Sequence, residues 1–220
     1  MTWQLPDPGP LPPGWVRVDC HLHTVHSGDA VTTIEQLAER VAAHRLDVVC
    51  VTDHHTLDGA WAALQRGIGA RVVVGEEIRT RCGEVIGLFL TERIPYVLGL
   101  DEVADRIRAQ GGLVSAPHPM DPDRRGLGAP GLCHLHETGL LDVVEVCNAK
   151  VRDSAHNTAA AEFAAERGIP VVAGSDAHDP HGVGAAVVQM PDFDGPREFL
   201  RRLPRARLAG RFRDHVGWLV

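Results

Sequence analysis

The feature that most constrains the fold is a regular alternation of short apolar runs with segments of helical spacing. Such runs are typical of strands buried on both faces, and their alternation with helices predicts a mostly parallel sheet. We predict strands at residues 16–19, 47–52, 71–75, 84–90, 113–116, 141–147, 170–173 and 185–189. We predict helices at residues 57–66, 99–110, 154–167 and 196–203, and another that is capped by Thr32 or Thr33 within the capping-box segment Thr32-Thr33-Ile34-Glu35. Residues 120–131 are predicted to form a loop.

Polar clusters follow directly after most of the predicted strands. An α/β barrel places its active site at the carboxyl ends of its strands, whereas an open doubly wound sheet concentrates its site at one switch point. We therefore expect a closed or nearly closed barrel of about seven strands with one site at its rim. The clusters contain His21 and His23, His54, Glu77, His118, Asn148, and Asp176 with His178.

Composition indicates one cytoplasmic domain behind a proline-rich arm. Residues 1–14 hold five prolines, and we expect an extended arm there and a single barrel domain over residues 15–220. The five cysteines form no CxxC pair, as is common in a reducing compartment. We expect neither a secretory signal nor a membrane-spanning helix. The net charge of −7 argues against general nucleic-acid binding, although the chain ends in a basic tail with Arg201, Arg202, Arg205, Arg207, Arg211 and Arg213.

The segment Asp19-Cys20-His21-Leu22-His23-Thr24 lies at the end of the first predicted strand. Side chains alternate between the two faces of a strand, so His21 and His23 are expected side by side on one face. Two imidazoles aimed at one point form half of a metal site. Asp19 shares their face and is expected to orient one of the histidines, and Asp53 is expected to act as a further hydrogen-bond acceptor behind the ligands.

The remaining strand ends supply more imidazole and carboxylate groups than one ion can hold. Mn²⁺, Fe²⁺ and Zn²⁺ accept these ligand types, and the sequence contains no clustered thiolates. We therefore predict two or three divalent metal ions, with Glu77 as the bridging carboxylate, at a site that activates water. The candidate ligands are His21, His23, Asp29, His54, Glu77, His118, Asp176 and His178.

Five segments carry a more specific signal when they are taken together. They are Asp19-Cys20-His21-Leu22-His23-Thr24 with Ser27 and Asp29, Thr52-Asp53-His54, Gly75-Glu76-Glu77-Ile78, Pro117-His118-Pro119 and Gly174-Ser175-Asp176-Ala177-His178. In type and order they resemble the motifs of the PHP (polymerase and histidinol phosphatase) family, over about residues 16–190. The resemblance implies a distorted (β/α)7 barrel of PHP type, with up to three metal ions at its rim, and activity as a phosphoesterase.

The resemblance also implies a ligand set for each ion. The implied sets are His21, His23, Glu77 and Asp176 for one ion, Glu77, His118 and Glu84 for a second, and Asp29, His54 and His178 for a third. Many members carry a histidine three residues before a strand glycine, where this chain has Glu84 before Gly87. Glu84 is therefore either an oxygen ligand or a solvated strand-edge glutamate, and in the second case the second site is weaker or empty. The residues expected to take part in catalysis are His21, His23, Glu77, Asp176 and His178, with Asp176 or His178 relaying protons.

A phosphate ester needs cationic groups as well as metal ions, and arginine offers a two-pronged grip. The candidates for substrate binding are Arg124, Arg125, Lys150 and Arg152, all on segments that follow predicted strands. The resemblance to members with an arginine shortly after the His-Pro step favours Arg124 or Arg125.

These observations predict a metal-dependent hydrolase that cleaves a small phosphate ester with a metal-activated water. One alternative is a 3′–5′ exonuclease or nucleotide phosphodiesterase that acts on short oligonucleotides, so that nucleic acid is a partner only as substrate. A second is a metallohydrolase that cleaves a non-phosphate bond. A third is a non-enzymatic module whose metal ions serve structure alone. No membrane partner is expected.

Overall fold

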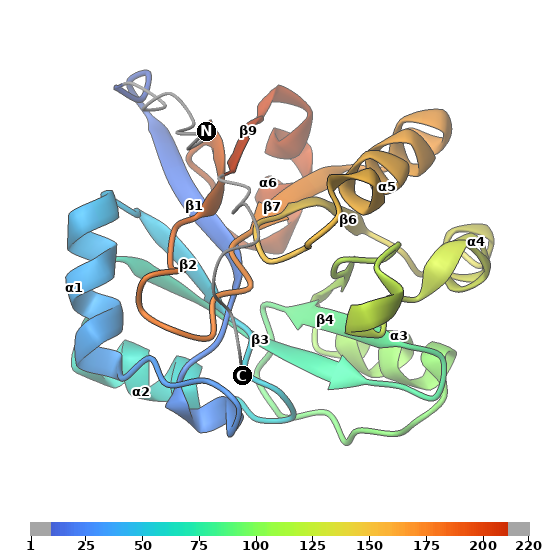
Figure 1. The fold of residues 1–220 in the computed structure, drawn as a ribbon, viewed down its shortest axis with the longest axis horizontal. Coiled ribbons are helices and arrows are strands. Elements are labelled where there is room, and N and C mark those ends of the chain that lie inside the picture. The colour runs from blue at the N-terminus through green and yellow to red at the C-terminus, as the bar shows by residue number, and fades with distance from the viewer. Residues whose placement is uncertain (1–9, 211–220) are drawn as a thin grey trace.

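Nine strands form one continuous sheet within residues 10–210, the part of the chain that the computed structural model describes. The sheet occupies the middle of the molecule and helices lie around it (Figure 1). Its order is β7-β6-β5-β4-β3-β2-β1-β8-β9. The strands are β1 (Trp15–Leu22), β2 (Val48–Val51), β3 (Arg71–Arg79), β4 (Glu84–Leu88), β5 (Leu113–Ala116), β6 (Val143–Asn148), β7 (Val171–Gly174), β8 (Ala186–Pro191) and β9 (Arg207–Gly210). The helices are α1 (Ile34–His44), α2 (Asp58–Arg66), α3 (Leu100–Ala109), α4 (Gly128–Glu137), α5 (Ser154–Arg167) and α6 (Gly195–Arg202), with 3₁₀ turns at Val25–Ser27, Pro122–Arg124 and Leu203–Arg205.

The sheet curls until its β7 end meets β1, which makes it a nearly closed barrel. Leu22, the last residue of β1, forms an isolated parallel bridge with Ala177. The His23 N–H donates to the Ala177 carbonyl at 2.9 Å, and the Asp176 N–H donates to the His21 carbonyl at 2.7 Å. The mixed α/β barrel expected from the sequence is therefore confirmed. These backbone bonds also place the first histidine pair beside the segment that carries Asp176.

The barrel is less parallel than the sequence predicts. Strands β1, β2 and β3 pair in parallel, as do β5, β6 and β7, but β4 runs antiparallel to both of its neighbours, and β8 runs antiparallel to β1 and β9. The reason for β4 lies in the short connection after β3. The Thr80 N–H donates to the Gly83 carbonyl at 2.8 Å and closes a tight turn, whereas a parallel pairing needs a crossover of a dozen or more residues.

An apolar layer fills the barrel beneath the polar residues of its rim. Inward-facing residues such as Val18, Val73 and Val143 belong to a buried cluster that contains no residue of α1 to α5. Outward-facing strand residues such as Val49 pack instead with the buried faces of the helices. The strands are buried on both faces. On the inner face, polar side chains lie closer to the rim than the apolar ones, as on β6, where Glu145 comes two residues after Val143 on the same face.

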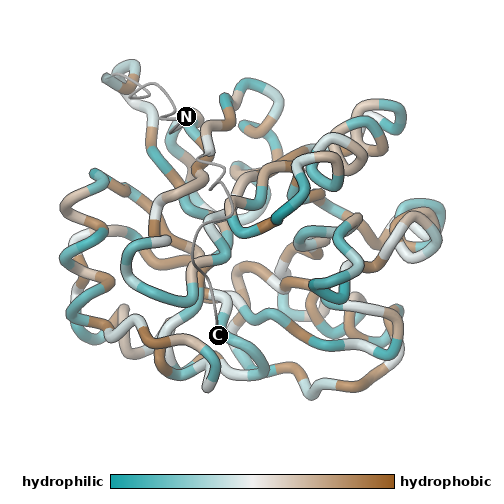
Figure 2. The backbone as a smooth tube through the Cα atoms, in the orientation of Figure 1, coloured by the Kyte–Doolittle hydropathy of each residue, from teal (hydrophilic) through white to brown (hydrophobic). Residues whose placement is uncertain are grey.

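Helix α1 illustrates how local sequence sets an element. Thr33 caps it by accepting from the Gln36 N–H at 3.2 Å, and the Gln36 side chain accepts from the Thr33 N–H at 3.0 Å. Of the two predicted caps, Thr33 is therefore the one that the helix uses, and its capping-box partner is Gln36 rather than Glu35. Ile34 and the rest of the buried stripe face the core, and polar and apolar segments alternate along the helix in Figure 2.

Several boundaries differ from the predictions. Strand β1 continues to Leu22, so His21 lies within the strand rather than after it. Helix α4 occupies residues 128–137, although residues 120–131 were predicted to form a loop. The glycine and proline residues at its start have low helix propensity and hide the helix in the sequence, and the burial of Leu132 and Leu135 stabilises it. The predicted basic tail contributes β9, and its residues Arg211 and Arg213 lie outside the described residues, as does most of the predicted arm. Within residues 10–210 no helix has the length and apolar character needed to cross a bilayer.

Candidate metal centre

Four overlapping groups of imidazole and carboxylate side chains meet at the rim of the barrel. Within each group the possible ligand atoms all lie within 4.8 Å of one another. The members come from β1, β3 and β4 and from the segments that follow β1, β2, β5 and β7. The groups are His21, His23 and Glu77; His21, His118 and Asp176; Glu77, Glu84 and His118; and His23, His54 and His178.

Glu77 lies at the middle of this centre. Its Oε2 atom is 3.2 Å from Nε2 of both His21 and His23, and its Oε1 atom is 3.1 Å from Nε2 of His118. The two Nε2 atoms of the His21–His23 pair are 3.1 Å apart, as their shared strand face predicts. Burial by itself would raise the pKa of Glu77, but the surrounding histidines hold it well below its usual range. The carboxylate is therefore ionised, and its two oxygen atoms face different histidines, so that each oxygen is available to bind a different ion.

Asp176 adds a second buried carboxylate to the same centre. Its Oδ1 atom lies 3.7 Å from Nε2 of His21 and 3.5 Å from Nε2 of His23. Burial raises its pKa, but Arg124 and then His21 outweigh that effect and hold the pKa well below its usual range. Its backbone has a φ of 51°, in the left-handed region, which is costly for a residue with a side chain and is common at functional sites.

Glu84 stands where the resemblance placed a histidine in related proteins. It belongs to a group with Glu77 and His118, so the structure brings this predicted residue to the centre. Burial, followed by repulsion from Glu77, raises the pKa of Glu84 to about 7. A carboxyl in this setting is stabilised by any added positive charge, because the positive charge offsets the repulsion.

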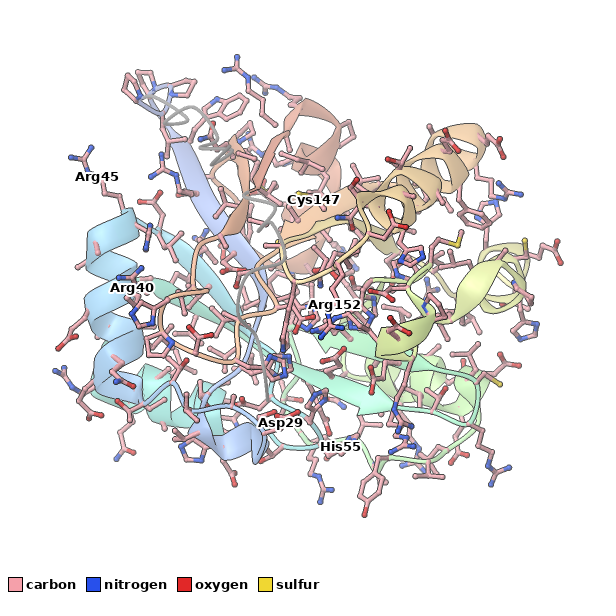
Figure 3. The ribbon with its side chains drawn as sticks, viewed as in Figure 1. Asp29, Arg40, Arg45, His55, Cys147 and Arg152 are labelled. Carbon is pink, nitrogen blue, oxygen red and sulfur yellow. The ribbon has the colours of Figure 1, made fainter. Side chains whose placement is uncertain are left out.

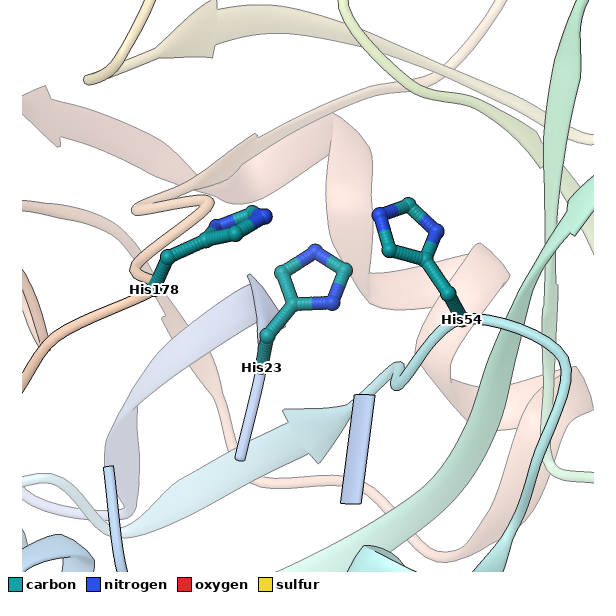
Figure 4. A group of neighbouring side chains, drawn as sticks. All are labelled: His23, His54 and His178. Atoms are coloured by element: carbon teal, nitrogen blue, oxygen red, sulfur yellow. The ribbon is translucent and has the colours of Figure 1, made fainter. Parts of the chain in front are cut away.

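Three imidazoles form the outer part of the centre. The rings of His23, His54 and His178 are turned toward one another in Figure 4, with the His23 ring centroid 4.6 Å from that of His54 and 4.2 Å from that of His178. Asp29 reaches the same place from the loop after β1, with Oδ2 3.4 Å from Nε2 of His54 and 3.5 Å from Nε2 of His178. Burial alone would lower the pKa of His54, but Asp29 and Glu77 raise it to about 9.

The chemistry of this donor set fits divalent metal ions. Glu77 and Asp176 are buried carboxylates, and buried charges in proteins are paired with opposite charge or coordinate metal ions. Imidazole nitrogen and carboxylate oxygen suit zinc, iron and manganese. His118 departs from the usual pattern of metal-binding histidines, in which the second ring nitrogen donates a hydrogen bond to a neighbour. Its Nδ1 atom is buried and has no hydrogen-bond partner in the structure.

Asp19, which was expected to orient one of the histidines, supports the backbone instead, and Asp53 is an acceptor for the residue that follows His23. Asp19 accepts from the N–H groups of His21 at 3.3 Å, Ser175 at 2.9 Å and Gly184 at 3.0 Å. The expected contact between Asp19 and an imidazole ring is therefore replaced by bonds that tie β1 to the segment after β7. Asp53 accepts from the N–H and the hydroxyl of Thr24, at 2.6 and 2.7 Å.

Glu145 is the functional candidate that the sequence analysis missed. Its Oε1 atom is 3.1 Å from Nδ1 of His21, and its Oε2 atom accepts from the N–H of His118 at 2.7 Å and from the Asn148 amide at 2.9 Å. The Asn148 amide also donates to Asp176 Oδ2 at 3.2 Å. With Nδ1 of His21 donating to Glu145, Nε2 of His21 is left free to bind. The one available signal was a lone acidic residue within an apolar strand run.

The four predicted cationic residues separate into two pairs. Arg124 places its Nη1 atom 3.0 Å from Asp176 Oδ2. Lys150 is mostly buried near the same carboxylate, and burial lowers its pKa while Asp176 opposes that shift. Arg125 and Arg152 are exposed. The side chain of Arg152 is among those labelled in Figure 3. The structure thus brings Arg124 into contact with the centre and Lys150 within electrostatic range of Asp176, whereas neither exposed arginine has a described contact with the centre.

Comparisons with known proteins give the centre its family context. Residues 19–118 match the model of the PHP domain, and residues 154–208 match the PHP-associated model. An uncharacterized protein of Methanocaldococcus jannaschii, MJ0417, is 36% identical over 197 residues, which cover 86% of this chain and 79% of the relative.

Solved structures share the fold at low sequence identity. A two-domain protein from Bacteroides vulgatus, described as containing a predicted PHP-like metal-dependent phosphoesterase, aligns with a TM-score of 0.72 and 18% identity, over 92% of this chain and 67% of that one. The lesion-specific endonuclease PfuEndoQ from Pyrococcus furiosus aligns with a TM-score of 0.62 and 17% identity, over 88% of this chain and 57% of that one. With the family models and the motifs around Glu77, these matches show that the chain belongs to the PHP family, whose members use divalent metal ions.

Proposed function

We propose that this protein is a metal-dependent phosphoesterase that hydrolyses a small phosphate monoester. The observation that carries the proposal is the meeting of four imidazole and carboxylate groups around Glu77, with Arg124 directly beside them. A site that combines several divalent ions with an arginine is suited to phosphoryl transfer, because the transferred group carries negative charge on its oxygens. The metal-binding groups and Arg124 thus both indicate a substrate that carries a phosphate group.

We propose two or three ions of manganese, iron or zinc as the cofactor. The residues that would hold them are His21, His23, Glu77 and Asp176 for one ion, Glu77, His118 and Glu84 for a second, and Asp29, His54 and His178 for a third. When bound, such ions lower the pKa of a water molecule to near neutrality and neutralise charge on phosphate oxygens.

The chain's own side chains would position the ester and move protons. Arg124 has its guanidinium at the edge of the centre, where it would hold a phosphate oxygen by a charge-assisted hydrogen bond. His178 lies with Nδ1 3.0 Å from the Asp176 carbonyl and 3.4 Å from its Oδ1. Since it lies at the outer, more exposed side of the centre, His178 would relay a proton between the site and solvent when the third ion is not bound to it.

A phosphodiester, such as a short oligonucleotide, is the second candidate substrate. The fold similarity to an endonuclease supports it at the level of architecture alone. The charge of the chain supports the monoester, because a net charge of −7 disfavours a long polyanion.

The test pairs metal analysis with a hydrolysis screen. Protein loaded with Mn²⁺ is expected to hold two or three metal ions per chain and to release phosphate from small monoesters faster than it cleaves diesters, by the argument from the donor set. His21→Ala is expected to lose metal and activity together. His134→Ala serves as the control, because His134 is an exposed histidine paired with Asp101 away from the centre.

Three results would contradict the proposal. A metal-loaded protein without phosphate-ester hydrolysis would remove the function, and unchanged metal content in His21→Ala would remove the ligand assignment. Faster turnover of diesters than of monoesters would move the assignment to the nuclease candidate.

A further inference from the structure

The segment between β5 and α4 carries Arg124 on a short turn whose geometry is set by Asp121. The Asp121 N–H donates to the His118 carbonyl at 3.0 Å, and the Asp121 carbonyl accepts from the Gly126 N–H at 3.1 Å. A Cβ atom at Gly126 would come within 2.6 Å of the His118 carbonyl oxygen, so the segment packs closely against His118. The backbone of Asp121 therefore links a candidate metal ligand to the turn that carries Arg124.

The Asp121 side chain fixes the same turn from inside the protein. It is 3% exposed, and its Oδ1 atom accepts from the Asp123 N–H at 3.0 Å, which caps the Pro122–Arg124 turn. The same oxygen lies 3.6 Å from Nδ1 of His156 on α5, within the distance of an ion pair. That nitrogen is buried and has no hydrogen-bond partner in the described structure. Because buried polar groups are costly when they are unpaired, we expect the His156 ring to hold its Nδ1 proton toward Asp121.

The first turn of α5 supports the metal centre along two routes. His156 reaches the turn that carries Arg124. Its neighbour Asn157 accepts from the Asn148 N–H at 3.2 Å and donates to the Asn148 carbonyl at 3.1 Å. The Asn148 amide in turn donates to Asp176 Oδ2, the atom that lies 3.0 Å from Arg124 Nη1. One turn of helix thus supports both the arginine and the aspartate that it contacts.

Arg124 depends on its backbone for the direction of its side chain. The side chain is 19% exposed, and its Nη1 atom contacts Asp176. Its Nε atom is buried and has no hydrogen-bond partner in the described structure. The side chain is therefore held at its tip by the carboxylate and at its base by the turn. A displacement of about 1 Å is enough to weaken the action of a group that positions substrate, so the turn itself has to be fixed.

We propose that Asp121 and His156 are positioning residues, which fix this turn and thereby aim the Arg124 guanidinium at the phosphate group of the substrate. The inference rests on the proposed function for the role of Arg124, and it adds two residues that act on phosphate through that arginine. Breaking the contact between the aspartate and the histidine is expected to weaken phosphate binding and to leave the metal content unchanged.

The test measures binding of inorganic phosphate by isothermal titration calorimetry. Each variant is loaded with Mn²⁺, freed of unbound metal and analysed for its metal content. Asp121→Asn keeps an oxygen for the Asp123 N–H but loses the charge that faces His156. We expect its Kd for phosphate to rise about 3- to 10-fold, the effect of one weakened hydrogen bond, with Mn²⁺ content as in the wild type. Asp123→Asn is the matched control, because it removes the charge of an exposed aspartate in the same turn.

Further variants separate a positioning role from a merely structural one. His156→Ala is expected to weaken phosphate binding as Asp121→Asn does, whereas His156→Asn, whose amide nitrogen occupies the place of Nδ1, is expected to retain most of the affinity. In the Arg124→Gln background, Asp121→Asn is expected to add no further loss, because the pair acts through Arg124. With a phosphate monoester as substrate, KM is expected to rise in Asp121→Asn by the same factor as Kd, while kcat is retained.

The outcomes for this inference and for the proposed function are distinguishable. Protein that shows these differences in phosphate binding but hydrolyses no ester supports the inference and contradicts the function. Wild-type affinity in Asp121→Asn, an equal loss in Asp123→Asn, a loss of Mn²⁺ or an additive loss in the double variant would overturn the inference, whether or not esters are hydrolysed. Absence of phosphate binding to the wild-type protein would also overturn it. Equal losses in His156→Asn and His156→Ala would overturn the role of His156.

Discussion

Glu76 and Glu77 are neighbours on β3, and both are fully buried, yet they face opposite sides of the sheet. Glu77 points into the rim, where His21, His23 and His118 approach within 3.2 Å and hold its pKa well below the usual range. Glu76 points outward, where it accepts from the Ile94 N–H at 2.8 Å. Burial there raises the pKa of Glu76 to about 7, and Arg93 at 4.0 Å compensates only in part.

The difference teaches that burial alone does not decide the charge of a carboxyl. Removing a carboxylate from water favours its protonated form, and nearby positive charge or hydrogen-bond donors favour the ionised form. Glu77 has several such partners and Glu76 has few. The alternation of side chains along one strand thus separates an ionised candidate ligand from a structural carboxyl whose pKa is raised to about 7, within a single step of the backbone.

The largest expected effect comes from removing the charge of Glu77. Glu77→Gln retains the size of the side chain but loses the carboxylate that two of the candidate metal groups share. We expect metal content to fall by at least one ion per chain and phosphoesterase activity to fall roughly 100- to 1000-fold. Elemental analysis and a hydrolysis assay check this. Glu76→Gln is the control on the same strand, and an equal loss of metal in that variant would break the comparison.

The next largest effect is a change in the protein's stability with pH, which arises from Glu76 on the outward face of β3. The pKa of Glu76 rises from 4.5 to about 7 on folding. The unfolded chain therefore loses this proton at lower pH than the folded protein. Stability falls as pH rises from 4.5 to 7, and above pH 7 the loss is constant at roughly 3 kcal/mol, from about 1.4 kcal/mol per pKa unit.

Glu76→Gln removes this titration. We expect the variant to match the wild type below pH 4.5 and to exceed its free energy of unfolding above pH 7, as measured by urea unfolding of chelator-treated protein at both extremes. A variant that is less stable than the wild type at high pH would show that Glu76 is ionised and well paired.

Glu145 sharpens the comparison, because it is an inward carboxylate that contacts ligands without belonging to a candidate metal group. Glu145→Gln weakens the hold on the His21 ring, and we expect metal affinity to fall about 10- to 100-fold. Calorimetric titration with Mn²⁺ measures this, and nitrogen chemical shifts of the His21 ring report its tautomer. Glu162→Gln, on the exposed side of α5, is the control. An unchanged affinity and tautomer would assign Glu145 to packing.

The smallest expected effect tests whether the cation beside Asp176 also serves substrate. Arg124→Gln removes a guanidinium 3.0 Å from that carboxylate, and we expect KM for a phosphate monoester to rise roughly tenfold. Arg125→Gln is the matched control, because its side chain is exposed one residue further along the same segment. Equal changes of KM in the two variants would contradict a specific role for Arg124.

The sequence by itself determined the types of ligand and their positions near strand ends. Apolar runs located most strands, and the two-residue period placed His21 and His23 on one face, because that period depends only on local backbone geometry. The sequence therefore predicted the shared face of this histidine pair and the barrel rim at which the other ligands meet it. The strand β4 was predicted but its antiparallel direction was not, and the helix α4 and the strand β9 were missed, because a tight turn, buried leucines and pairing at a sheet edge leave little trace in local patterns.

Only the tertiary structure decided which partners each polar group meets. Glu145 is 124 residues from His21 in sequence, and closure of the barrel brings the two within 3.1 Å. The same closure gives Glu77 its histidines, while the return of the chain along the outside of β3 leaves Glu76 with one N–H and a distant arginine. Local sequence sets the direction of a side chain, but its charge state depends on groups that only the folded chain brings into contact.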